Sequence, residues 1–289
     1  MTVRLTQREM AVKAALDAVR ARCDVSARRE ADPVGIVHRY RAPRDRELVG
    51  LVAACIAFGN AKTIRAKLDD LLGRLGPSPA RAADDPRALA ARLRGWKHRV
   101  FRGEDVARLL CGARAVQREH GSLGACFATG LERGTLREAL AELCDAIREA
   151  GGLTRGHLLS DARGPSGNKR LLLFLRWMAR PADGVDLGLW AVDAARLLVP
   201  VDVHVHRLSR NLGLTRRRTT SWRTTEEITR ALSRFDPRDP VKYDFSLCHM
   251  GMLQRCPSRR DPRRCAGCPV MPVCIHWKKK STVAGDPCE

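Results

Sequence analysis

Apolar residues recur along most of the chain with the three-to-four-residue period of an α-helix, and Pro/Gly clusters separate the periodic segments. Thr6 is placed to cap a first helix that runs to about residue 22. Residues 46–58, RELVGLVAACIAF, are apolar enough to form a central buried helix. Strand patterns are hard to find, so we predict an all-α fold. Further helices are predicted at residues 61–75, 104–119, 135–150, 169–180, 222–235 and 241–254.

The segment PVDVHVHR, which begins at residue 200, carries two competing patterns. Its three alternating valines suit a strand, whereas the apolar spacing from Val205 to Leu212, followed by Gly213, suits a helix. The helix explains more residues, so we expect Asp202 to be the N-cap of a helix over residues 203–212. The two histidines would then point about 200° apart on that helix, and we do not expect them to bind one metal ion.

The stretch GPSGNKRLLLFLRWM, which begins at residue 164, places turn-forming residues directly before a strongly apolar helix. We expect Ser166 to be the N-cap, with Gly167 and Asn168 in the first turn, where unpaired N–H groups bind phosphate. Lys169 would follow near the third helical position. There the helix dipole and the neighbouring Arg170 favour a neutral, nucleophilic amine. The alternative is a solvent-exposed lysine tolerated at a helix start.

The charge balance points to a polyanionic partner. The chain has 53 Lys and Arg against 32 Asp and Glu, a formal net charge of +21. The alternative is an arginine-rich composition spread over solvated faces. Only 4% of the residues are aromatic, which argues against a sheet that stacks many exposed bases. No apolar run has the length of a membrane span and no signal-peptide core is present, so we expect a cytoplasmic protein.

Eleven cysteines in a cytoplasmic protein are unlikely to form disulfides, and four of them are clustered. The cluster CPSRRDPRRCAGCPVMPVC has the spacing C-x8-C-x2-C-x5-C, which suits a tetrahedral Zn site or a [4Fe–4S] cluster. A single C-x2-C knuckle, unlike the two of a zinc ribbon, favours the [4Fe–4S] cluster over Zn. The candidate ligands are Cys256, Cys265, Cys268 and Cys274, and the candidate phosphate-binding arginines of this loop are Arg259, Arg260, Arg263 and Arg264.

The order of these features resembles the helix-hairpin-helix DNA glycosylase superfamily, which includes endonuclease III and the 8-oxoguanine glycosylases. VDVHVHR resembles the VDxHVxR segment that carries the catalytic aspartate, here Asp202, and GNKR resembles the helix start that carries the catalytic lysine, here Lys169. CIAFGNAKTI resembles the segment that inserts a polar side chain into DNA, here Asn60. The resemblance covers residues 46–277.

The chain departs from that family in three places. Its first cysteine spacing is x8, whereas endonuclease III has x6, so the shape of the loop differs. ARGPSG stands where an LPGVG-like hairpin is expected. Lys169 and Asp202 lie 33 residues apart, a longer interval that is closer to the archaeal 8-oxoguanine glycosylases and hints at oxidised purines.

The resemblance implies a two-lobed helix-hairpin-helix architecture. Residues 46–194 would form a helical-barrel lobe with the hairpin, residues 1–45 and 195–277 a second lobe with the cysteines, and residues 278–289 a disordered tail. The implied activity is base excision from damaged double-stranded DNA by a nucleoid-associated monomer, with an abasic-site lyase step through Lys169. The alternatives are a non-catalytic, structure-specific DNA-binding protein with a Zn or Fe–S loop, and an RNA-directed enzyme with the same fold.

Overall fold

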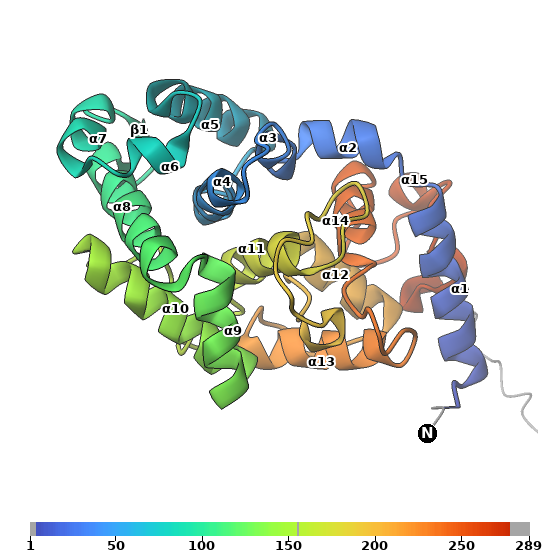
Figure 1. Cartoon of the computed structure of the whole chain (residues 1–289). Helices are drawn as coiled ribbons and strands as arrows, with labels where there is room; N and C mark the ends of the chain where they lie inside the picture. Colours follow the sequence, from blue (N-terminus) through green and yellow to red (C-terminus); the bar gives the residue numbers. More distant parts are fainter. Residues whose placement is uncertain (1–3, 155, 278–289) are drawn as a thin grey trace, which may run out of the picture.

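The computed structural model describes residues 4–154 and 156–277, and helices dominate these residues (Figure 1). Fifteen α-helices, three short 3-10 helices and one two-stranded hairpin occur in this part of the chain. The all-α prediction is therefore confirmed at the level of the fold class. The tail of residues 278–289, where we predicted disorder, lies outside the described residues.

The first half of the chain forms ten helices and the hairpin. The hairpin pairs β1 (Lys97–His98) with β2 (Phe101–Arg102) in antiparallel register. The predicted central helix is present, and its residues 47–55 are all buried. The helices are α1 (Gln7–Ala21), α2 (Val25–Ala31), α3 (Val34–Val37), α4 (Pro43–Cys55), α5 (Ala61–Leu75), α6 (Pro79–Ala82), α7 (Pro86–Arg92), α8 (Gly103–His120), α9 (Leu123–Arg133) and α10 (Leu136–Gly151).

The second half has longer connections between fewer helices. These are α11 (Lys169–Ala179), α12 (Val203–Leu212), α13 (Trp222–Ser233), α14 (Asp244–Leu253) and α15 (Pro262–Cys265), with 3-10 turns η1 (Ala194–Arg196), η2 (Met271–Val273) and η3 (Ile275–Trp277). In Figure 1, α11 lies in the middle, between a group formed by α5–α10 and a group that includes α1, α14 and α15. The expected lobe boundaries and the helix-hairpin-helix architecture stay predictions.

A buried carboxylate in α4 joins three other parts of the chain. Glu47 accepts hydrogen bonds from the Gln117 side chain at 2.7 Å, the Trp190 indole at 2.7 Å, and the backbone N–H groups of Leu123 at 3.0 Å and Gly124 at 3.1 Å. Those two N–H groups belong to the first turn of α9, which would otherwise bury unpaired donors. The helix also has a local N-cap, Ser122, which accepts from the Ala125 N–H at 2.9 Å. The sequence pattern did not predict α9.

The helix that begins at Lys169 is held in place by a buried ion network. Arg176 of α11 is 2% exposed and pairs with Asp186, at 3.1 Å, and with Asp244 at the start of α14. Arg180, one turn later, pairs with Asp186 at 2.8 Å and with Asp239 at 2.9 Å. A buried arginine with fewer partners would be strongly destabilising. The network therefore fixes the position of α11 against α14.

Candidate functional site

A cavity of about 490 Å³ lies beside the first turn of α11, and we call it the lysine cavity. Lys169 and Asp202, the two predicted catalytic residues, both line it. They come from the starts of two different helices, α11 and α12. The fold thus brings together two side chains that are 33 residues apart in the sequence. Further lining residues are Asp32, Phe58, Gly59, Ala61, Ser166, Asn168, Arg170, His204, Thr220, Cys248 and His249.

The helix start at Lys169 differs from the prediction. Lys169 is the first residue of α11 and not its third, because the residue before the helix is Asn168 in a left-handed conformation with φ 48°. Ser166 is not the N-cap; its hydroxyl instead accepts from the Asn168 N–H at 3.2 Å. The Asn168 side chain is buried and donates to the Ala162 carbonyl at 3.2 Å.

A long-range contact explains this shift. Ser166 forms a β-bridge with Ser221, and the Gly167 N–H donates to the Thr220 carbonyl at 3.2 Å. The turn is thereby tied to the segment before α13, which prevents it from continuing α11 backwards. The N–H groups of Gly167 and Asn168 are consequently hydrogen-bonded within the protein, although we expected them to be unpaired.

Asp202 is the N-cap of α12, as predicted. Its Oδ1 accepts from the backbone N–H groups of His204 and Val205, both at 2.8 Å. Its Oδ2 accepts from the Cys248 thiol at 3.5 Å. Three contacts therefore fix the carboxylate at the wall of the lysine cavity.

Carboxylates also gather on the inner side of the cavity. A smaller cavity of about 50 Å³ is lined by Lys169, Asp202, Asp32 and Asp244. Burial, opposed by Arg176 and aided by Asp202, raises the pKa of Asp244 to about 6. The same ion pair acts oppositely on Arg176: burial lowers its pKa, but Asp186 and Asp244 outweigh this effect and raise it. We take the pair as charged, because two carboxylates contact one guanidinium.

Several residues at this site were not predicted from the sequence. Cys248 is half-buried at the lysine cavity, and burial followed by Asp202 raises the pKa of its thiol. The imidazole Nε2 of His249 lies 3.4 Å from the Asp32 carboxylate, an ion-pair distance without hydrogen-bond geometry. Phe58 supplies an aromatic wall. These residues come from segments that are distant in the sequence, and only the folded chain brings them to the lysine cavity.

Three aromatic residues of α11 and the segment after it are buried in the core. Phe174 is 1% exposed and Trp190 is 6% exposed, and their rings meet edge to face with centroids 5.2 Å apart. Trp177 is fully buried and reaches only the smaller inner cavity.

The remaining predicted DNA contacts fall into different settings. Asn60 is exposed and caps α5, accepting from the Lys62 N–H at 2.9 Å, and its neighbours Gly59 and Ala61 line the lysine cavity. Asn60 therefore lies at the edge of that cavity. Arg170, in contrast, donates to three backbone carbonyls of this chain: those of Cys55, His157 and Leu158.

The four predicted ligand cysteines line one small cavity of about 20 Å³. Its other walls are mainly apolar and include no Asp or Glu in the described part of the chain, and Asn211 donates to the Cys256 sulfur at 3.3 Å. Burial, followed by the neighbouring cysteines, raises the pKa of the Cys256 thiol, although Asn211 acts against this rise. The four sulfurs could hold a metal centre, whose positive charge would favour their thiolate forms.

The same four cysteines are not arranged as a ready metal site. Within residues 4–154 and 156–277, no group of three or more His, Cys, Asp or Glu side chains has the geometry to hold a metal ion. The fold therefore brings the sulfurs around one cavity without specifying Zn or [4Fe–4S].

The arginines of the cysteine loop are all exposed, as phosphate binding requires. Arg260 lies over the Trp277 ring, 4.3 Å from its centroid, and Arg264 lies 3.6 Å from Asp261. Arg259 lines the cysteine cavity, and Arg263 lies on α15.

Comparison with known proteins adds one finding. Residues 32–253 match the family described as "Protein of unknown function (DUF2400)". The chain belongs to this family. No curated protein and no solved structure matches the sequence of this chain. The DUF2400 match contains Lys169, Asp202 and Cys248 and ends before Cys256. All lining residues of the lysine cavity except Ala31 therefore lie inside the matched segment, and the four candidate ligand cysteines lie outside it.

Proposed function

We propose that this DUF2400 protein is a DNA glycosylase with abasic-site lyase activity, which acts on duplex DNA that contains a damaged base or an abasic site. One observation carries the proposal: Lys169 and Asp202 line the same cavity of about 490 Å³. Cavities of about 300–1,000 Å³ are typical of small-molecule sites, so one extruded nucleotide fits this volume. The strongly positive net charge of +21 supports a nucleic-acid substrate.

The chemistry follows from the two side chains. The Lys169 amine attacks the anomeric carbon of the extruded nucleotide, the glycosidic C–N bond breaks, and the base leaves with the bonding electrons. Asp202, held by two backbone N–H groups, stabilises the positive charge that develops on the sugar and accepts the proton that Lys169 releases. The resulting Schiff base permits strand cleavage by elimination.

Asn60 would fill the space that the extruded nucleotide leaves in the duplex, because it lies at the edge of the lysine cavity. The exposed arginines of the cysteine loop would bind backbone phosphates. Oxidised purines are the lesion class to test first, with a monomer as the acting species.

We propose that Cys256, Cys265, Cys268 and Cys274 hold a [4Fe–4S] cluster, with Zn as the alternative. The donor set fits, since four sulfurs share a cavity without carboxylates, and the Asn211 amide donates toward one sulfur. The bound group would supply a structural cross-link, and no step of base excision requires it.

We also propose a cytoplasmic, nucleoid-associated location. In the described part of the chain, no helix is long and apolar enough to cross a membrane.

Borohydride trapping on abasic-site DNA tests the proposed function. The native protein is expected to form a covalent adduct, and Lys169→Gln is expected to form none. Lys62→Gln is the matched control, because Lys62 also lies in the first turn of a helix near the cavity. It should still be trapped, so an adduct that depends on Lys62 instead would refute the assignment of Lys169.

The alternative function makes a different prediction in the same assay. A non-catalytic, structure-specific DNA-binding protein would bind the abasic-site duplex but give no adduct in its native form. In that case Lys169 would contact a phosphate, and Lys169→Gln would weaken DNA binding, while neither the native protein nor the variant would form an adduct.

A further inference from the structure

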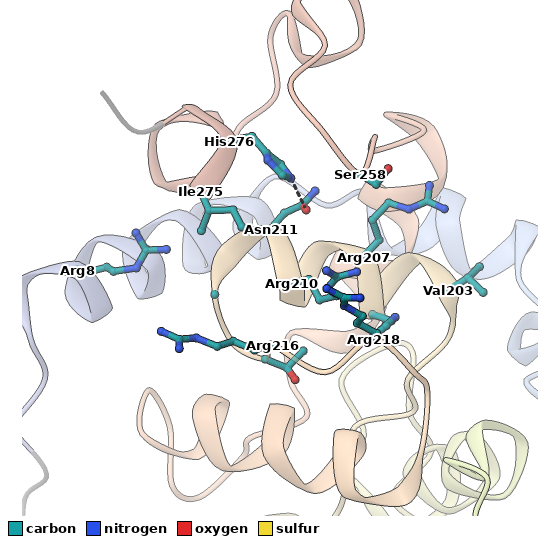
Figure 2. A pocket seen from close by; sticks show the side chains of 13 residues that line it. Arg8, Val203, Arg207, Arg210, Asn211, Arg216, Arg218, Ser258, Ile275 and His276 are labelled. Carbon is teal, nitrogen blue, oxygen red and sulfur yellow. Dashed lines mark hydrogen bonds between the residues drawn. The ribbon is translucent and has the colours of Figure 1, made fainter. Parts of the chain in front are cut away.

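A second cavity, of about 640 Å³, lies along the outer side of α12, and we call it the arginine pocket (Figure 2). Five arginines line it, and its lining residues include no Asp or Glu in the described part of the chain. Figure 2 shows that they come from three segments: α1, α12 and the loop after α12. None of them belongs to the DNA contacts proposed above. They are Arg8, Arg207, Arg210, Arg216 and Arg218.

Two of these arginines are held by the protein itself. Arg8 donates to the Leu212 carbonyl at 3.1 Å, and Arg207 donates to the Cys256 carbonyl at 2.9 Å. Both therefore keep a fixed position while their charge remains unneutralised, because a carbonyl carries no net charge. Guanidinium groups fixed close together repel one another, and a bound anion removes that cost.

The other three arginines are exposed and available to a ligand. Arg210 lies on α12, and Arg216 and Arg218 lie in the loop after it. The loop contacts the acidic side chain of Glu227, which pairs with Arg217 at 2.7 Å and accepts from the Thr215 hydroxyl at 2.9 Å and the Arg216 backbone N–H at 3.3 Å. The ion pair of Glu227 is thus with Arg217, which does not line the pocket.

The pocket also has a built wall. The Asn211 side chain donates to the Pro257 carbonyl at 2.9 Å and makes a 3.0 Å hydrogen bond with the His276 ring, drawn as a dashed line in Figure 2. On the other side, the His206 ring makes a 3.1 Å hydrogen bond with the Arg217 carbonyl. These bonds connect α12 to the cysteine loop and to the loop after α12. They hold in place the segments that carry the lining arginines.

The arginine pocket adjoins the lysine cavity. Val203, which is 62% exposed at the start of α12, lines both. The loop after α12 also serves both, since Arg218 lines the pocket and Thr220 lines the cavity. A strand that leaves the lysine cavity past Val203 therefore meets the arginines next.

We infer that the arginine pocket binds successive backbone phosphates of the DNA strand whose extruded nucleotide occupies the lysine cavity. Arginine forks match phosphate oxygens, and a pocket without carboxylates does not repel them. The inference rests on the proposed function for the identity of the strand, while the pocket itself requires only a nucleic-acid phosphate.

Salt-dependent binding tests this inference. The triple variant Arg210→Gln, Arg216→Gln and Arg218→Gln should lower the slope of log K against log salt by about two to three, since each duplex phosphate contact contributes about 0.9. The control carries the same loss of charge on exposed arginines near α6 and α7: Arg81→Gln, Arg87→Gln and Arg94→Gln. It should keep the native slope. A pocket variant with the native slope would overturn the inference.

Trapping over a range of abasic-site DNA concentrations separates the two proposals. The triple variant should need a higher DNA concentration for half-maximal adduct than the native protein, because it lacks three of the proposed phosphate contacts. If the triple variant has a reduced salt slope of DNA binding but the native protein gives no adduct, the arginine pocket binds DNA and the proposed lyase activity is refuted. Lysine replacements at the three arginines, which keep the charge, should largely restore the slope and serve as a check on folding.

A free polyphosphate offers the same chemistry as a DNA backbone, so tripolyphosphate is the competing ligand in a second titration. The inference requires that DNA displaces tripolyphosphate from the native protein. Binding of tripolyphosphate that depends on the three arginines but is not displaced by DNA would overturn it.

Discussion

Asp202→Asn is expected to separate the structural role of this residue from its chemical role. The Oδ1 of Asp202 accepts two backbone hydrogen bonds at 2.8 Å, and an asparagine oxygen can accept the same two bonds. Asn and Asp are about equal as N-caps, so the free energy of unfolding should change by less than about 0.5 kcal/mol. Asp202→Ala, which removes the cap, should cost about 0.5–2 kcal/mol.

The effect on base excision should be far larger. The variant loses the carboxylate that lines the lysine cavity together with Lys169 and that the proposed mechanism uses to accept the lysine proton. General acid–base catalysis contributes about 10²–10⁴ in rate, which corresponds to roughly 3–5 kcal/mol of activation free energy. Single-turnover excision, measured at saturating DNA so that binding does not limit the rate, should therefore fall by that factor for Asp202→Asn.

Asp85→Asn is a matched control. Asp85 is the N-cap of α7, and its Oδ1 accepts from the backbone N–H groups of Arg87 and Ala88 at 3.1 and 3.0 Å. Asp85 does not line the lysine cavity, the cavity of the four clustered cysteines or the arginine pocket. Both variants should melt like the native protein, and only Asp202→Asn should lose excision. Excision retained by Asp202→Asn would refute the assigned role.

Three further predictions concern stability and the cysteine cluster. Asp244→Ala removes one of the two carboxylates that pair with the buried Arg176 and leaves the Asp186 pair, so urea denaturation should show a loss of about 3 kcal/mol. Hydrogen bonds from Arg234 lower the pKa of Glu9 from 4.5 to about 2, so its stabilising effect is full above pH 4.5 and is lost as the pH falls towards 2. The difference in melting temperature between the native protein and Glu9→Gln should shrink over that range. Cys268→Ser should abolish bound metal, measured by elemental analysis, and brown colour in the native protein would identify iron rather than zinc.

Each of these predictions has a result that would contradict it. An unfolding free energy of Asp244→Ala within 1 kcal/mol of native would show that the network does not need this carboxylate. A Glu9→Gln difference that does not depend on pH would show that the Arg234 pair adds no stability. Cys126→Ser changes a half-buried cysteine outside the cluster and should retain full metal content. Equal metal content in Cys268→Ser would remove Cys268 from the ligand set.

Local sequence patterns predicted α12 well, because its signals lie within the helix and next to it. Asp202 provides the cap, the apolar spacing provides the buried face, and Gly213 adopts the left-handed conformation that ends the helix. The same holds for α1, whose capping box joins Thr6 to Glu9. Both ends of each interaction lie within four residues, so the sequence alone was sufficient.

Where the decisive contact is distant, the sequence was not sufficient. The pattern at residues 164–169 favoured a cap at Ser166, but the bridge from Ser166 to Ser221 moved the start of α11 to Lys169. The first turn of α9 has a local cap, Ser122, but its Leu123 and Gly124 N–H groups donate to Glu47, which lies on α4. These contacts form only after the chain has folded, so no local propensity encodes them.

The candidate site shows the same division. Its chemical groups, Lys169, Asp202 and the four clustered cysteines, were recognisable from residue type and spacing. Their surroundings were not: Cys248 at the Asp202 carboxylate, and an arginine pocket assembled from residues as distant as 8 and 276, depend on which surfaces the folded helices bring together. Residue chemistry is local to the chain, whereas a cavity is a property of the packing of distant segments.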